Sequence, residues 1–178
     1  ATGKLSNLTR QKSENSMEKL AWTPDGNSIC YSKDGNLWTV MTNGKDNKCI
    51  LTRESLKFQV PPAIKSPAVT PDGKKVFVTL DSDGLFAHVS NNQVAVLDLE
   101  SGKFEIIADA NSWALSPDGK SLAYSIGGEL IIHDLASGGK SVFASGENPA
   151  FSPDGNKIAF LFRASMLQEP SVMTKKIK

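Results

Sequence analysis

Two short segments carry the residue types that bind phosphate or calcium. The segment SGGKS at 137–141 has the glycines and lysine of a phosphate-binding loop, but that motif needs another glycine at position 134, where Asp134 stands. The segment DSDG at 81–84 supplies two carboxylates of a calcium loop and lacks both the third acid and the distal glutamate. We interpret the first segment as a hairpin turn and the second as a polar loop.

Other side chains with catalytic or metal-binding chemistry are scattered. His88 and His133 are the two histidines, and neither has a cysteine or a histidine at zinc-ligand spacing. No serine lies in a G-x-S-x-G elbow. Asp81, Asp83 and Glu169 remain as carboxylates for an enzymatic or glycan-binding site. The sequence therefore predicts no catalytic residue, no metal ligand and no cofactor, and it indicates a protein that is not an enzyme.

A four-residue turn recurs along the chain and defines the elements that would position any site. Proline presets φ at the second turn position, aspartate hydrogen-bonds nearby backbone, and glycine accepts positive φ at the fourth. The turn glycines follow one another after 47, 46 and 36 residues, a period typical of propellers and solenoids. The copies are Thr23-Pro24-Asp25-Gly26, Thr70-Pro71-Asp72-Gly73, Ser116-Pro117-Asp118-Gly119 and Ser152-Pro153-Asp154-Gly155.

Each turn is expected to join two strands, here called a and b, of a four-stranded antiparallel meander. An alanine precedes every copy in register, and a β-prone segment such as SLAYS (121–125) follows it. A second glycine turn, as in VAVLDLESGK (94–103), then joins strands c and d. Trp22 and Trp113, both close to the a–b turns, are expected to pack between neighbouring repeats.

Repeats of this length with an S/T-P-D-G turn resemble the blades of PD40 (TolB-like) β-propellers, a WD40-like repeat class. The resemblance covers nearly the whole chain and implies an all-β fold of four-stranded antiparallel blades around an axis. It also implies a periplasmic or extracellular location. The family includes propellers that gate prolyl-oligopeptidase-type peptidases. The expected blades are residues 17–52, 64–109, 111–145 and 148–178 of a single domain.

The two ends of the chain predict how such a propeller closes. The last repeat stops after strand c, while residues 1–9 read as a c–d turn and a strand d, so they are expected to pair into the last blade as its outer strand. A closed four-blade ring is the first interpretation. The alternatives are an eight-blade ring assembled from two chains and a piece of a larger propeller.

Charge, apolar runs and cysteine positions limit the classes of partner and of covalent bond that the chain can be expected to form. The formal net charge is +1, which gives no reason to expect binding to nucleic acid. The longest apolar run, IAFLF at 158–162, is too short to span a membrane. Cys30 and Cys49 fall in strands b and d of one blade, about 9–10 Å apart and beyond the reach of a disulfide. Cys30 is expected to be a small core residue, and the chain to be a monomer rather than a homodimer.

Unequal loop lengths indicate a binding face. In an up-and-down meander, the a–b and c–d turns lie on one face and the b–c and d–a connections on the other. All extra length falls in the second group, in segments 9–19, 52–66, 81–92 and 163–170. Insertions into a repeat often mark the binding face. The candidate contact residues there are Arg53, Lys57, Phe58, Phe86, His88, Arg163, Met166 and Glu169.

An apolar centre with charged neighbours is typical of a protein-binding surface. The first functional hypothesis is therefore a non-catalytic propeller that binds a protein or peptide through the long-loop face. The second is an accessory or gating propeller of a larger hydrolase such as a prolyl-oligopeptidase-type peptidase. The third is a small-ligand or glycan-binding propeller.

Overall fold

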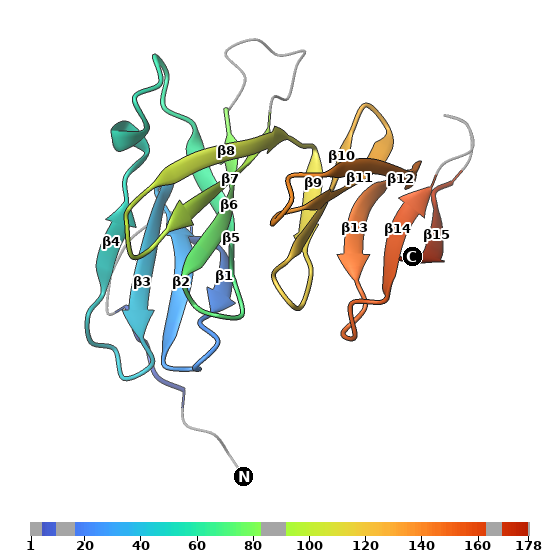
Figure 1. Cartoon of the computed structure of the whole chain (residues 1–178). Helices are drawn as coiled ribbons and strands as arrows, with labels where there is room; N and C mark the ends of the chain where they lie inside the picture. Colours follow the sequence, from blue (N-terminus) through green and yellow to red (C-terminus); the bar gives the residue numbers. More distant parts are fainter. Residues whose placement is uncertain (1–4, 10–16, 83–91, 163–168, 178) are drawn as a thin grey trace. The chain divides into compact units, whose positions relative to one another are not determined.

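A computed structural model describes residues 5–9, 17–82, 92–162 and 169–177, apart from the side chain of Glu18 (Figure 1). Over these residues the chain is all-β, with one short 3₁₀ helix. It divides into two compact units. The first contains residues 1–90 and 95–106, and the second contains residues 91–94 and 107–178. The single propeller domain expected from the sequence stays a prediction.

The first unit contains blade 1 and most of blade 2, both antiparallel four-stranded sheets in sequential strand order. In β2 the strand residues alternate between two faces, so that Cys30 and Tyr31 lie on opposite sides of the sheet. Blade 1 comprises β1 (Met17–Trp22), β2 (Ser28–Lys33), β3 (Asn36–Met41) and β4 (Lys48–Leu51). Blade 2 comprises β5 (Ala63–Val69), β6 (Lys75–Asp81), β7 (Gln93–Asp98) and β8 (Phe104–Asp109).

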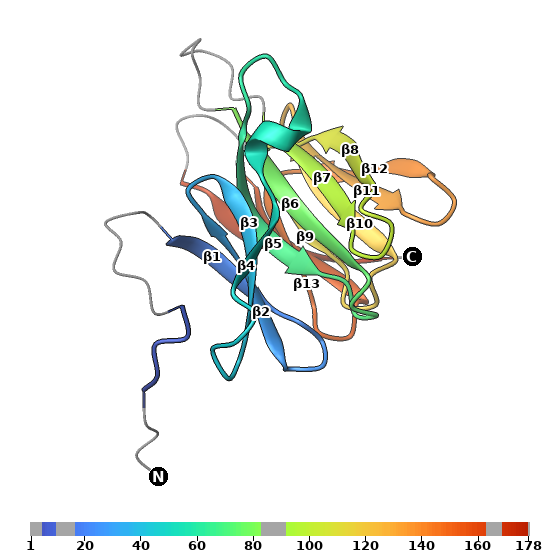
Figure 2. The same cartoon turned by 90° about the vertical axis from the view of Figure 1, so that its left-hand side faces the viewer.

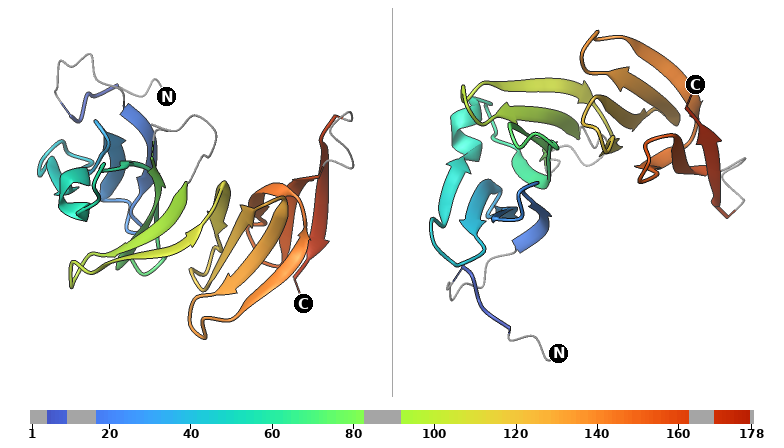
Figure 3. Two further views of the ribbon diagram at one scale, coloured as in Figure 1. Left: turned by 90° about the horizontal axis from the view of Figure 1, so that it is seen from above. Right: turned by 60° about the horizontal axis from the view of Figure 1, so that its bottom comes forward.

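The second unit contains blades 3 and 4 (Figure 3). Blade 3 is a four-stranded sheet of β9 (Ser112–Leu115), β10 (Ser121–Ile126), β11 (Glu129–Asp134) and β12 (Lys140–Ser145). Blade 4 shows three strands over the described residues, namely β13 (Glu147–Phe151), β14 (Lys157–Phe162) and β15 (Ser171–Lys176). The sequence pattern thus predicted the propeller-blade fold correctly.

The a–b turns share one hydrogen-bond arrangement in all four blades. In blade 2, the Thr70 hydroxyl donates to Asp72 Oδ1 at 2.6 Å and accepts from the Lys75 amide at 3.0 Å. Asp72 Oδ1 also accepts from the Lys74 amide at 3.0 Å. The same bonds in blade 4, led by the one from the Ser152 hydroxyl, lower the pKa of Asp154 to about 2.

Backbone bonds place the two kinds of connection at opposite ends of each blade. At one end, the amide of Thr42 after strand c donates to Asn27 O of the a–b turn at 2.9 Å. At the other end, the amide of Ile64, in β5 directly after the d–a connection, donates to Gly35 O of the b–c turn at 2.9 Å. Figure 2 shows the 3₁₀ helix η1 at one end of the first unit and the β1–β2 hairpin turn at the other.

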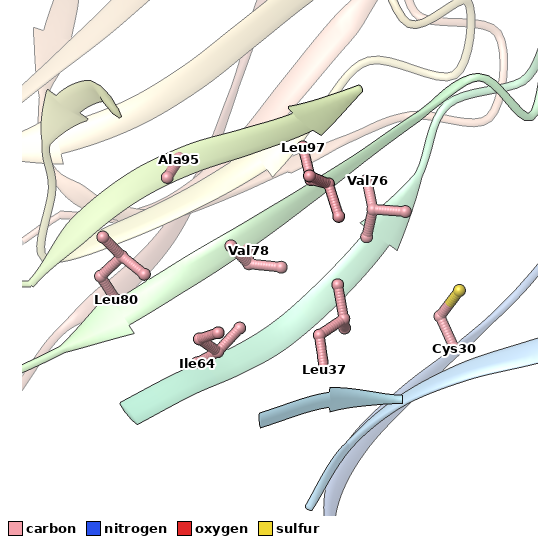
Figure 4. Packing of buried hydrophobic residues seen from close by; sticks show 8 residues of the cluster. All are labelled: Cys30, Leu37, Ile64, Val76, Val78, Leu80, Ala95 and Leu97. Atoms are coloured by element: carbon pink, nitrogen blue, oxygen red, sulfur yellow. The ribbon is translucent and has the colours of Figure 1, made fainter. Parts of the chain in front are cut away.

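Two apolar clusters hold neighbouring blades together, one within each unit. In the first, Cys30 and Leu37 of blade 1 face blade 2 (Figure 4), and both thiols of the chain are free. The predicted core role of Cys30 is confirmed by its 2% exposure. The cluster comprises Cys30, Leu37, Ile64, Val76, Val78, Leu80, Ala95 and Leu97, and the one in the second unit comprises Ala123, Leu130, Ile158 and Phe160.

Residues 5–9 carry no strand in the structure and lie beside blade 1. The carbonyl oxygen of Leu8 is 3.3 Å from the position that a Cβ on Gly44 would take, and Asn47 Nδ2 donates to Thr9 O at 3.4 Å. Closure of the last blade by residues 1–9 therefore stays a prediction.

Candidate binding surface

The candidate surface begins with the d–a connection of blade 1, residues 52–62. Its first turn is the 3₁₀ helix η1 (Arg53–Leu56), stabilised by the Ser55 amide and hydroxyl, which both donate to Thr52 O. The helix ends at Lys57, whose backbone is left-handed with φ of 56°. This reversal turns the chain directly before Phe58, and two bends at Gln59 and Val60 follow before β5 begins.

This connection is fixed to the b–c turn of blade 1 by polar contacts. The amide of Arg53 donates to Asn36 Oδ1 at 2.8 Å, and the Arg53 side chain lies across Gly35. A Cβ on Gly35 would come within 3.1 Å of Arg53 Cδ and 3.4 Å of Ala63 Cα. Gly35 also has φ of 73°, so glycine suits this position both sterically and conformationally.

The connection is apolar on both its inner and outer sides. Leu56 packs inward against the core cluster of the first unit, and Pro62 is buried. On the outer side, Phe58 is 38% exposed and Val60 is 54% exposed. Because the segment is anchored at both ends, these two residues are presented on a fixed base, which limits the entropy lost when a partner binds.

Charged residues precede this apolar pair in the chain. Arg53 Nε lies 3.8 Å from Glu54 Oε1, in a partly exposed pair of modest energetic value. Lys57 is exposed. At the neighbouring end of blade 2, Lys65 Nζ and Asp81 Oδ2 form an ion pair at 2.9 Å. Asp81, one of the scattered carboxylates, is therefore engaged in a structural pair.

The predicted contact residues are only partly brought together. Arg53, Lys57 and Phe58 lie on one anchored segment of the first unit. Glu169 is exposed and belongs to the second unit. Phe86, His88, Arg163 and Met166, and also Asp83, lie outside the described residues.

Sequence reasoning missed two residues that shape this surface, Gly35 and Asn36. Their signal was the segment KDGN at 33–36, because a D-G pair between β-prone segments is a strong hairpin signal. The role of Asn36 as an acceptor for an amide 17 positions later depends on tertiary structure, which the local pattern does not contain.

Metal binding and transmembrane helices have no support in the part of the chain that the structure describes. It contains no group of three or more His, Cys, Asp or Glu side chains that could hold a metal ion. Within the same ranges, no helix has the length and hydropathy needed to cross a bilayer. His133 is buried, and burial, followed by the charge of Lys140, lowers its pKa below 6.5.

Comparisons with known proteins identify the fold. No protein family model matches the chain, and no curated protein matches it. Among solved structures, TolB from Acinetobacter baumannii is similar with a TM-score of 0.66 and 22% identity, over 94% of this chain and 42% of that one. The chain thus spans less than half the length of this TolB.

Two further solved structures have the same fold at lower identity. Porphyromonas gingivalis dipeptidyl peptidase 4 gives a TM-score of 0.59 and 13% identity, covering 89% of this chain and 28% of the peptidase. A chain of a nidogen/laminin complex gives a TM-score of 0.62 and 13% identity, covering 89% of this chain and 60% of that one. At these identities the comparisons establish a TolB-like β-propeller fold.

Proposed function

We propose that this propeller is a PD40-type module that binds a protein or peptide through its long-loop face and is not itself a catalyst. The observation that supports this most directly is the exposed pair Phe58 and Val60 on an anchored connection with Arg53, Lys57 and Glu54 beside it. Aromatic side chains held on a rigid base are frequent binding hot spots, and a charged surround favours one orientation of the partner.

The charge and chemistry of the surface define the class of partner. Within residues 53–60 this surface offers the exposed apolar side chains of Phe58 and Val60, the cations Arg53 and Lys57, and the carboxylate of Glu54. A short peptide with an apolar residue next to an acidic one would satisfy both kinds of group. Similarity to a chain of a nidogen/laminin complex and to TolB is compatible with protein binding. By the same resemblance, we place the protein in the periplasm or outside the cell.

The proposal is tested with peptides selected from a random library on the wild-type protein. Val60→Ser should weaken the selected peptides about 5- to 30-fold, as expected for a residue near the centre of an interface. The matched control is Val142→Ser, because Val142 is a strand valine with 62% exposure compared with 54% for Val60. Phe58→Ala should weaken binding at least as much. Equal affinity of Val60→Ser and Val142→Ser would refute the proposal.

A second candidate function is favoured by the similarity to dipeptidyl peptidase 4. A propeller attached to a peptidase domain would control access to the catalytic site rather than bind a free partner. Sequencing the gene on both sides of the segment that encodes residues 1–178 distinguishes the two. A G-x-S-x-G domain in the same reading frame would favour the accessory role.

A further inference from the structure

Arg53 is the cation of the candidate surface whose side chain is held in place by the fold. Its amide donates to Asn36 Oδ1 at 2.8 Å, which fixes its backbone on the b–c turn of blade 1. Its Cδ and Nη1 lie 3.1 Å and 3.2 Å from the position that a Cβ on Gly35 would take, so the side chain rests against the turn where glycine leaves room for it. The side chain is still 35% exposed, and it is therefore both positioned and accessible.

The guanidinium of Arg53 has donors that the described residues do not use. Nε is buried and has no hydrogen-bond partner among these residues. The carboxylate of Glu54 lies 3.8 Å from Nε, which is longer than a hydrogen bond, and its side chain is 69% exposed. An exposed ion pair of this kind contributes little, whereas a guanidinium presents five N–H donors in a planar fork. Since Nε is buried, the donors left for a ligand are those of Nη1 and Nη2.

Lys57, the other cation within residues 52–62, is presented differently. It is exposed, and its backbone is left-handed with φ of 56°. An ammonium group is a strongly hydrated point charge, and it does not form the two parallel bonds that a guanidinium forms with a carboxylate. Lys57 therefore adds attraction for any anion, whereas Arg53 can discriminate between anions by their geometry.

The same turn holds both ends of the connection and closes it into one loop. The connection starts with Arg53 on Asn36 and ends where the Ile64 amide donates to Gly35 O at 2.9 Å. Compact surface loops whose ends meet in this way are frequently functional. The apolar pair occupies the middle of the loop. A peptide that covers the apolar pair thus contacts the same loop that carries the guanidinium.

We propose that Arg53 determines the specificity of this surface by donating two parallel hydrogen bonds, from Nη1 and Nη2, to the side-chain carboxylate of an aspartate or glutamate inside the bound peptide. This inference rests on the proposed function and adds which residue recognises the acid. An apolar residue next to that acid covers Phe58 and Val60. A charge-assisted pair of this kind is strong and directional. Because the guanidinium is already positioned in the free protein, little side-chain entropy is lost on binding.

A change in the peptide tests this pair without altering the protein. Peptides selected on the wild-type protein are synthesised with an acetylated N-terminus and an amidated C-terminus, so that side chains carry the only carboxylates. Each should contain an aspartate or a glutamate. Replacing that residue by asparagine or glutamine keeps its size and removes its charge. The Kd from fluorescence anisotropy should then rise about 10- to 100-fold, the range for hydrogen bonds to charged groups.

Two matched exchanges of cations test which residue recognises the acid. Arg53→Lys keeps the charge and loses the fork, so it should weaken the acidic peptide about 10-fold and leave the amide peptide unchanged. Lys57→Arg should change both values of Kd less than about 2-fold. Combining Arg53→Lys with the peptide change gives a double-mutant cycle, which measures the coupling between the two groups. Arg53→Gln replaces Arg53→Lys if circular dichroism shows that the latter does not fold.

Any of three results refutes this role of Arg53. The first is a set of selected peptides without an acidic residue. The second is an amide peptide that binds as tightly as the acidic one. The third is equal weakening by Arg53→Lys and Lys57→Arg. If Val60→Ser weakens the same peptides and Val142→Ser does not, the proposed function stands and only the role of Arg53 fails. Equal affinity of these two serine variants refutes the proposed function itself.

Discussion

Replacing Thr70 by valine tests whether the repeated turn depends on its hydroxyl group. Thr70 is 5% exposed, and its hydroxyl donates to Asp72 Oδ1 at 2.6 Å and accepts from the Lys75 amide at 3.0 Å. Valine has nearly the same shape but leaves that amide without its acceptor. An unsatisfied, partly buried donor costs about 1–3 kcal/mol, so we expect the free energy of unfolding to fall by that amount.

The matched control is Thr70→Ser, because blades 3 and 4 carry serine at the same turn position as Ser116 and Ser152. Serine keeps the hydroxyl and loses one methyl group, which costs about 0.8 kcal/mol when it is buried. The valine variant should therefore melt about 2–4 °C lower than wild type for each kcal/mol lost.

The assay is urea and thermal unfolding followed by circular dichroism. If the two units unfold separately, the transition of the first unit is the one to compare, since Thr70 belongs to it. A valine variant that is as stable as the serine variant would refute the reasoning. It would show that backbone conformation alone maintains the turn.

Three further changes follow from the same structure. The pKa of Asp154 is about 2 in the folded state and 3.8 in the unfolded state, so its turn contributes stability above pH 3.8 that is lost as pH falls through 2. Asp154→Asn should therefore flatten the dependence of the urea midpoint on pH between pH 3.8 and pH 2. His133 has a lowered pKa, so the unfolded state binds the proton more readily and stability should decrease as pH falls below 6.5. His133→Leu should remove that dependence, and an NMR titration of His133 that gives a pKa above 6.5 would contradict it. Gly146→Ala should cost about 1–3 kcal/mol by overpacking, since its Cβ would lie 2.5 Å from Phe160 Cδ2. Gly127→Ala, at φ of 59° compared with 156° for Gly146, is the control without a steric clash, because its Cβ would have no atom within 4 Å. Equal unfolding free energies of the two variants would contradict the steric cause.

The blade fold was predictable because its signals are local. Proline, aspartate and glycine set the turn within four residues, and the bonds between the Thr23 hydroxyl and Asp25 and between Ser116 and Asp118 confirm the geometry. Strand faces followed from alternation in the same way. The repeat multiplied these signals fourfold, so accidental matches became improbable.

The binding surface was less predictable because its geometry depends on contacts between distant segments. Loop length identified residues 52–66, but the anchoring of Arg53 on Gly35 and Asn36 joins two connections that are separated by strands β3 and β4. Trp22 is 58% exposed over the described residues. The packing between repeats that its size and position predicted requires a covering surface, which a pattern within one repeat does not specify, so this packing stays a prediction.

The bond between the a–b and c–d turns has a consequence for how such proteins can diversify. An amide after strand c donates to the carbonyl of the residue after the turn glycine in every blade, from Thr42 to Asn27, Leu99 to Lys74, Leu135 to Lys120 and Ile177 to Asn156. This fixes the strand register at one end of the sheet. Connections at the opposite end are then free to accept inserted residues without shifting any strand by one position. A library of randomised d–a connections could therefore be built on this chain while the blades stay in register.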